Sequence, residues 1–159
     1  MTKKLLERLT HHAKDLEHEL KSTLPEEIRK AASLGDLSEN AEYEAALERQ
    51  RVVQSQFRSL KSRINEIALI DMSRLPRDRV GYGSKVKLLD LDDDHELCYE
   101  LVMPEDSDAK HNRISVSSPI GKSLLGKAEG DEAHVNIPSG VRNYEIMEVT
   151  PYHEGPQDL

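Results

Sequence analysis

The sequence predicts an α+β protein, in which a long antiparallel α-helical hairpin precedes a small antiparallel β-sheet domain with one short helix. The spacing of apolar residues is the main reason. Over the first half of the 159 residues it follows the period of a helix, and after residue 80 it changes to the period of two that strands require. A glycine at position 35 divides the helical half, and the connection around it is so short that the two helices must fold back as neighbours.

The first predicted helix carries an apolar seam at spacings of four, three and four residues, formed by Leu9, Ala13, Leu16 and Leu20. Pro25 interrupts this helix. Because proline lacks an amide hydrogen and is best tolerated in a first helical turn, we expect a kink or a restart there, with Glu26 and Glu27 favouring the new N-terminus. The helix then continues through Leu34 and stops at Gly35.

The second predicted helix runs from Ser38 to Asp71 and carries two series of residues at seven-residue intervals. They are Ala46, Val53, Leu60 and Ile67, and Tyr43, Gln50, Phe57 and Ile64. All but the glutamine are apolar or aromatic, which is the pattern of a coiled coil. At about 1.5 Å per residue the helix would be roughly 50 Å long, which is more than a compact core needs. We therefore predict that the hairpin is an extended arm whose length serves its reach.

We expect an arm at residues 1–74 with its tip at 35–39, a linker at 75–79, a C-terminal domain at 80–153 and a tail at 154–159. The strands predicted for the C-terminal domain are Ser84–Asp90, Glu96–Met103, Ile114–Val116, Ala133–Pro138 and Tyr144–Thr150. The acidic run at 92–94 predicts a hairpin turn between the first two strands. The single helix of the C-terminal domain is predicted at Pro119–Leu125, with Ser118 as N-cap and Gly126 as the stop.

Charge and composition exclude several classes of protein. Residues 1–74 have no net charge and residues 75–159 carry −8, which argues against unaided binding to bare DNA. No stretch approaches the roughly 20 apolar residues of a membrane helix, and the charged N-terminus is unlike a signal peptide, so a cytoplasmic protein with no membrane contact is expected. The single cysteine, Cys98, excludes an internal disulfide and is expected to be a buried strand thiol rather than a nucleophile.

Two interpretations fit Asp36 and Glu39, the acidic residues of the predicted tip. In the first, Asp36 or Ser38 caps the second helix, and the spacing of Asp36 and Glu39 is that of a capping box. In the second, the two carboxylates share one face and offer hard oxygen ligands to Mg²⁺. Two ligands are too few for an autonomous Mg²⁺ site but suffice if another macromolecule completes the coordination shell.

Two segments of the sequence resemble signature motifs of the bacterial Gre family of transcript cleavage factors. They are GDLSENAEYEAA at residues 35–46 and ISVSSPIGKSLLGK at residues 114–127. Both occur in the expected order, and the resemblance covers nearly the whole chain. The electrically neutral arm, without a large basic run, is closer to the GreA branch than to the GreB branch. The resemblance implies that the C-terminal domain is FKBP-like.

The resemblance also implies a function. Such a factor binds RNA polymerase as a monomer and inserts its coiled coil into the secondary channel, near the 3′ end of the nascent RNA. There it stimulates the polymerase's own endonucleolytic cleavage of backtracked RNA and is not itself an enzyme. By motif position, Asp36 and Glu39 match the acids that help to hold the polymerase's second catalytic Mg²⁺, an ion not bound tightly by the factor alone. Ser117, Ser118 and Pro119 match the loop that docks at the polymerase rim.

Two features of the sequence differ from what the resemblance implies. DNA binding is among the family's descriptors, although the charge of this chain argues against binding to bare DNA. The first helix is short between Leu20 and Gly35 and contains Pro25, so the register of the lower coiled coil is open while the tip motif is intact.

Basic and histidine side chains of the arm raise two further hypotheses. Arg49 and Arg51, with Arg58 and Lys61 farther along, could form a basic patch that faces RNA. The alternative is an ordinary solvated helix face, on which these arginines pair with Glu44 and Glu48. A metal site can be considered for His11, His12 and His18, but no ligand motif such as HExxH is present and surface histidines are favoured.

Alternative functions follow from the same features. A Gre-like polymerase regulator without cleavage stimulation would share the fold. A prolyl isomerase is conceivable by analogy with an FKBP-like domain, but residues 75–159 contain no Trp or Phe to line an apolar pocket. A purely structural coiled-coil adaptor would need no acids at its tip, and an autonomous metal nuclease would need more converging carboxylates or a base.

Overall fold

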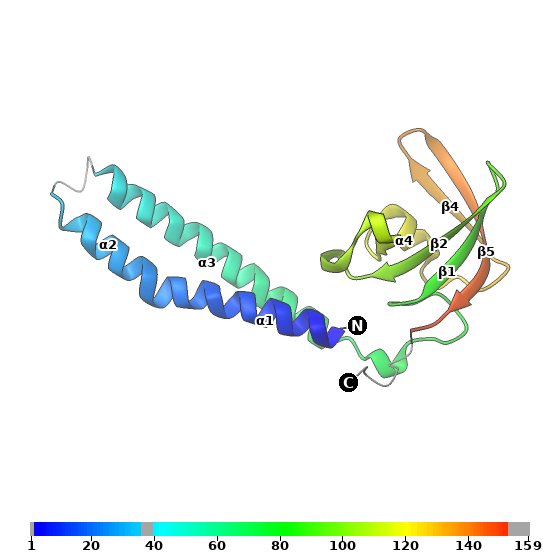
Figure 1. The fold of residues 1–159 in the computed structure, drawn as a ribbon, viewed down its shortest axis with the longest axis horizontal. Coiled ribbons are helices and arrows are strands. Elements are labelled where there is room, and N and C mark those ends of the chain that lie inside the picture. Colours follow the sequence, from blue (N-terminus) through cyan, green and yellow to red (C-terminus); the bar gives the residue numbers. More distant parts are fainter. Residues whose placement is uncertain (1, 36–39, 153–159) are drawn as a thin grey trace. The chain divides into compact units, whose positions relative to one another are not determined.

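The computed structural model describes residues 2–35 and 40–152 and divides into two compact units, one spanning Thr2–Ile70 and one that begins at Asp71. The first is a helical hairpin and the second is a curled five-stranded sheet with one short helix (Figure 1). The predicted α+β class is therefore confirmed. Among the described residues, no helix combines the length and the apolarity that crossing a membrane would require.

The hairpin is formed by a first arm in three pieces and a second arm that is one continuous helix. The first arm consists of α1 (Thr2–His18), a π-helical segment (Glu19–Thr23) and α2 (Leu24–Ala32). The second arm is α3 (Ala41–Ala68), which runs back alongside α2 and α1 (Figure 1). The heptad series of α3 is confirmed, because Ala46, Val53 and Ile67 are buried and the companion series is half-buried.

The predicted restart of the helix at Pro25 is present, and a π-helical segment directly precedes it. The amide of Leu24 donates to the carbonyl of Glu19, five residues earlier in the chain. In an α-helix it would donate to the carbonyl four residues earlier. Pro25 has no amide hydrogen, and in a regular helix its ring would clash with the carbonyl four residues earlier. A wider turn before the proline avoids that clash while the chain remains helical, so the seam continues from α1 into α2.

The core of the hairpin lies where the two arms meet around this segment. Its buried members are Leu16, Leu24 and Val53, and Leu20, Phe57 and Leu60 pack against them. Leu24 is 1% exposed and Val53 is fully buried. In contrast, Leu34 lies beyond the end of α2 and is 66% exposed, so the seam of the first arm ends before the predicted Leu34. Gly35 has a φ of +130°, which is consistent with the predicted helix stop.

The second unit is a sheet with the strand order β3-β2-β1-β5-β4. Its strands are β1 (Lys85–Asp90), β2 (His95–Val102), β3 (Arg113–Ser115), β4 (Glu132–Ile137) and β5 (Gly140–Thr150). All neighbouring pairs are antiparallel except β2 and β3, which are parallel. The β1–β2 turn falls at the predicted acidic run 92–94, and a register shift at Lys87 and Leu88 lets the long strand β5 bend along β1.

One face of this sheet, together with α4 (Pro119–Leu124), encloses the core of the second unit. Its buried side chains include Val86 and Leu88 of β1, Leu101 of β2, Leu124 of α4 and Ile146 of β5.

The expectation of a buried Cys98 is wrong, because its thiol is exposed. Strict alternation along β2 places Leu97, Tyr99 and Leu101 on the face that packs. Cys98 shares the opposite face with charged neighbours and pairs with Lys87 of β1.

We predict that Leu24→Ala lowers the free energy of unfolding of the hairpin by about 3 kcal/mol, because it removes a fully buried side chain where the two arms meet. Chemical denaturation followed by helical circular dichroism measures this change. Leu34→Ala is the matched control, since the same atoms are removed from an exposed position. Equal stability of the two variants would contradict this account of the core.

Candidate functional site

The end of the hairpin at which α2 and α3 are connected contains the acids that the sequence singled out. Asp36 and Glu39 themselves lie outside the described residues, whereas both helix ends that flank them are described. The N-cap of α3 is Asn40, and not Asp36 or Ser38 as the capping interpretation predicted. The side-chain oxygen of Asn40 accepts a hydrogen bond from the amide of Tyr43 at 3.1 Å, and α3 begins one residue later, at Ala41.

Asn40 makes a second hydrogen bond that crosses the hairpin. Its side-chain nitrogen donates to the carbonyl of Ala31, in the last turn of α2, at 2.5 Å. Ala31 is buried, and its carbonyl also accepts a hydrogen bond from the backbone amide of Leu34 at 3.2 Å. One side chain therefore bonds to the first turn of α3 and to the last turn of α2.

Two of the three arginines of the proposed basic patch, Arg49 and Arg51, are paired within the hairpin. Arg49 forms a bidentate ion pair with Glu19 of the π-helical segment, with Nε–Oε1 and Nη2–Oε2 distances of 2.8 and 3.2 Å. The hydrogen bond to Glu19 raises the pKa of Arg49. Arg51 contacts Glu48, one helical turn away on α3, at 2.9 Å. These contacts favour the solvated-face interpretation, although Arg49 pairs across the hairpin instead of with Glu44.

The loop before α4 holds Ser117, Ser118 and Pro119 in a fixed geometry. Ser118 is the N-cap of α4, as predicted: its hydroxyl accepts from the amide of Gly121 at 3.1 Å and donates to the carbonyl of Ser115 at 2.6 Å. A Cβ on Gly121 would lie 2.1 Å from that same carbonyl oxygen, so only glycine allows α4 to approach this closely.

The outer side of this loop is accessible. Ser117 and Pro119 are exposed, whereas Ser118 is half-buried. Ser118 therefore has a structural role in the loop, and Ser117 and Pro119 are the residues that face solvent.

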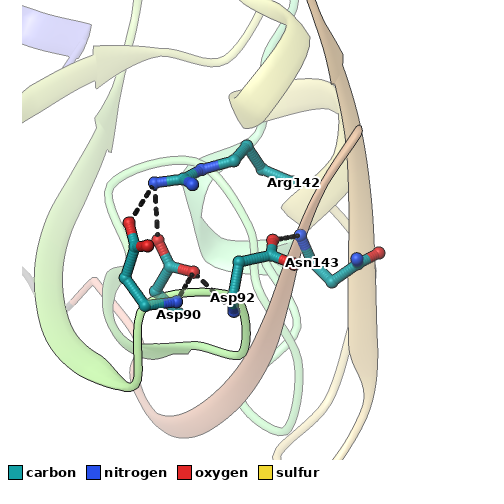
Figure 2. Close-up of polar contacts among 5 residues, drawn as sticks. Asp90, Asp92, Arg142 and Asn143 are labelled. Atoms are coloured by element: carbon teal, nitrogen blue, oxygen red, sulfur yellow. Dashed lines mark hydrogen bonds and ion pairs between the residues drawn. The ribbon is translucent and has the colours of Figure 1, made fainter. Parts of the chain in front are cut away.

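A polar network at the β1–β2 turn contains Asp90, the one buried charged residue among residues 71–152, which the structure describes. Asp90 is 1% exposed, and its Oδ1 accepts from the amides of Asp92 and Asp93 at 2.9 and 3.2 Å. Arg142 of β5 contacts Oδ2 of Asp90 at 3.1 Å and Oδ2 of Asp93 at 2.7 Å. Asp92 accepts from the amide of Asn143 at 2.9 Å (Figure 2), so both Arg142 and Asn143 attach the turn to β5.

The electrostatics of this network keep Asp90 ionised. Burial alone would raise the pKa of its carboxyl, but the two backbone amides and the Arg142 guanidinium outweigh burial and lower the pKa. The hydrogen bond to Asp93 in turn raises the pKa of Arg142.

Asp90, Asp93 and His95 also form a cluster whose potential metal-ligand atoms lie within 4.8 Å of one another. Within residues 2–35 and 40–152 no other group of His, Cys, Asp and Glu converges in this way, and His11, His12 and His18 do not. Carboxylate oxygens suit Mg²⁺. However, Arg142 already supplies the positive charge between the two carboxylates, so an ion would have to displace it.

Comparison with known proteins supplies the family. Residues 75–151 match the family described as "Transcription elongation factor, GreA/GreB, C-term", and residues 1–68 match "Transcription elongation factor, N-terminal". The chain belongs to the GreA/GreB family of transcription elongation factors. It is 38% identical to transcription elongation factor GreA of Rickettsia canadensis over 94% of this chain and 92% of that one. It is 42% identical to GreA of Helicobacter hepaticus over 94% and 91%.

Solved structures of relatives include a GreA/GreB factor from Nitrosomonas europaea. It is 34% identical, covers 57% of this chain and 78% of its own, and aligns with a TM-score of 0.43. As a member of the GreA/GreB family, the chain is an elongation factor and not an enzyme in its own right. None of these matches supports DNA binding by the chain.

The sequence analysis did not identify two residues whose side chains join separate elements of the structure, Asn40 and Arg142. Asn40 is a favoured N-cap residue directly before the first helical residue, so a local signal for its cap was present in the motif. Its bond to Ala31 had no such signal, because it joins residues nine apart across a turn. Arg142 was not recognisable either, since its partners lie about fifty positions away along the chain.

We predict that the stability contributed by Asp90 depends on pH. Because the folded state lowers the pKa of Asp90, this stability is present above the unfolded pKa of about 3.9 and is lost as the pH falls below it. Asp90→Asn should therefore be less stable than the wild type near pH 7, and the difference should shrink towards acid pH. Urea denaturation at a series of pH values measures it.

The control is Asp94→Asn, the same change in the same turn at a residue with a φ of +57°, which Asn tolerates. It should leave stability nearly unchanged at each pH. A difference between Asp90→Asn and the wild type that stays constant from pH 7 to pH 3 would contradict the ionised, buried Asp90.

Proposed function

We propose that this GreA/GreB family member stimulates RNA polymerase to cleave backtracked nascent RNA, with the helical hairpin entering the secondary channel of the polymerase. The observation that carries the proposal is the joint presence of a long two-armed hairpin and of the acidic motif at its connection. Relatives that align over more than nine-tenths of this chain are named GreA. The hairpin supports such a role mechanically, because α3 alone has 28 residues and is about 42 Å long.

The chemical role is proposed for Asp36 and Glu39. Their donor set fits Mg²⁺, which accepts one or two carboxylates and completes its shell with water or substrate phosphate. An ion shared with the polymerase would activate water and stabilise phosphoryl charge. The chain's own task is then to hold two carboxylates at the end of a stiff hairpin. Helix α3 is already capped by Asn40, so the cap does not require either acid.

We further propose that the arm, 1–74, and the C-terminal domain, 80–153, divide the work, with the linker at 75–79 between them. The loop of Ser117, Ser118 and Pro119 is the proposed docking surface for the polymerase. Its rigidity supports this assignment, because the Ser118 cap and the tight approach of Gly121 hold Ser117 and Pro119 outward without further ordering on binding.

We expect Asp36→Asn and Glu39→Gln to leave polymerase binding intact and to reduce stimulated cleavage at least about tenfold, which corresponds to about 1.4 kcal/mol of transition-state stabilisation. The physical reason is that each change removes a negative charge and one oxygen ligand at nearly constant size. RNA length in a backtracked elongation complex, followed with time, measures the effect. Raised Mg²⁺ or added Mn²⁺ should partly restore each single variant.

The matched control is Glu44→Gln, the same chemical change in the first turn of α3, outside the pair. It should cleave like the wild type. If Asp36→Asn and Glu39→Gln also stimulate cleavage normally, the proposed chemistry is wrong. If the wild type binds polymerase and stimulates no cleavage, the chain is a polymerase regulator of another kind.

For docking, we predict that Ser117→Arg weakens polymerase binding at least about tenfold while the thermal stability of the protein falls only slightly, because the change removes an exposed hydroxyl contact with Ser115. A long cationic side chain would cover the exposed side of the loop, whereas Ser118→Arg would also remove the cap of α4. Direct competition for polymerase measures affinity. Ser139→Arg, the same change in the exposed β4–β5 turn, is the control, and equal affinity of both variants would move the docking surface elsewhere.

A further inference from the structure

β2 and β3 are parallel neighbours in the sheet of the second unit, so their carboxyl ends lie side by side. Val102, the last residue of β2, pairs with Ser115, the last residue of β3, and the amide of Val116 donates to the carbonyl of Val102 at 2.9 Å. The chain that follows β3 is the proposed docking loop, residues 117–119. The chain that follows β2 is a 3₁₀ turn, Pro104–Asp106, which contacts β3. The turn and the docking loop therefore leave the sheet next to each other.

The 3₁₀ turn is held firmly on the sheet. Met103, directly before it, is 2% exposed, and its carbonyl accepts from the amide of Asp106 at 2.9 Å. The carbonyl of Pro104 accepts from the hydroxyl of Ser107 at 3.0 Å and from the amide of Ser107 at 3.3 Å. Proline fixes its own φ at the start of the turn. Binding of a partner here would therefore cost little further ordering of the chain.

Both segments present side chains to solvent at this end of the sheet. Pro104 and Glu105 of the turn are exposed, and so are Ser117 and Pro119 of the docking loop. Each proline lies in the first turn of a short helical segment, which favours its fixed φ. An apolar ring and a polar side chain from each segment give the mixed character that surfaces of protein complexes commonly have.

The charge of the turn indicates the kind of partner surface that fits it. Glu105 is exposed and its neighbour Asp106 is half-buried, so the turn brings negative charge beside the docking loop. Opposite charges across an interface speed association and fix its register. A basic region of the partner is therefore expected to face the turn.

We propose that the 3₁₀ turn 104–106 is a second part of the polymerase docking surface, with Glu105 contacting a basic side chain of the polymerase beside the place that receives the docking loop. This inference rests on the proposed function, in which the docking loop binds polymerase. Three loop residues are far fewer than the roughly 20–30 that each side of a stable interface supplies, so the docking surface has to extend beyond them. The turn extends it with a neighbour that the sheet holds in place.

The experiment changes the charge of Glu105 in two steps and measures polymerase affinity by direct competition. Glu105→Gln removes the negative charge and should weaken binding about threefold, whereas Glu105→Arg reverses the charge and should weaken it at least about tenfold. Because salt screens exposed charges, both losses should shrink as the salt concentration rises. Glu105 is exposed, so the thermal stability of both variants should stay close to that of the wild type.

Glu132→Arg is the matched control, because it makes the same change in net charge at an exposed position of β4. Glu132 lies opposite Glu145 in the sheet, so its replacement should not weaken the fold. The control should bind polymerase like the wild type. A second readout separates docking from chemistry: at saturating factor, both Glu105 variants should stimulate cleavage of backtracked RNA to the wild-type level, because only binding is changed.

The outcomes distinguish this inference from the proposed function. Wild-type affinity in both Glu105 variants, while Ser117→Arg binds weakly, would overturn the role of the turn and leave the docking loop in place. Equal losses in Glu105→Arg and Glu132→Arg would show an effect of net charge alone and would also overturn it. If Ser117→Arg and both Glu105 variants all bind like the wild type, the docking surface lies elsewhere and both proposals fail.

Discussion

The continuous packing of one apolar seam along two antiparallel arms is the constraint on which the hairpin depends. α3 meets this requirement with a regular heptad pattern, but the first arm contains Pro25, which no regular helix interior accepts without distortion. The π-helical turn resolves the conflict, because Leu16 before it and Leu24 after it pack on the same residue, Val53. Arg49 reinforces the alignment at the same level by pairing with Glu19 of the π turn.

Side-chain contacts hold a chain connection in both the hairpin and the sheet, but the chemistry of these contacts differs. In the sheet unit, Asp90 closes the β1–β2 turn with its own backbone contacts, and Arg142 attaches that turn to β5. At the hairpin connection, Asn40 joins two helix ends with a neutral amide. The difference has a chemical consequence, since a neutral tie adds no charge next to Asp36 and Glu39, whereas Arg142 neutralises the acids it contacts.

Much of the candidate site could be predicted from local patterns. The Ser118 cap, the proline at the start of α4, and Gly126, with a φ of +79°, each follow from backbone rules that involve neighbouring residues only. Cys98 shows where such reasoning fails. Its apolar neighbours suggested burial, but the face of a strand is decided by what packs on it, and the packed face begins one residue away at Leu97.

The sequence by itself determined the order of the elements, the family and the acidic motif at the hairpin connection, because periodicity, capping and motif spacing are properties of contiguous residues. Only the tertiary structure decided the π turn before Pro25, the pairing of Arg49 with Glu19, and the bridge from Asn40 to Ala31. Each of these depends on how two segments lie against each other. The position of one arm on the other follows from packing the whole seam, and that packing brings the partners within reach of a hydrogen bond.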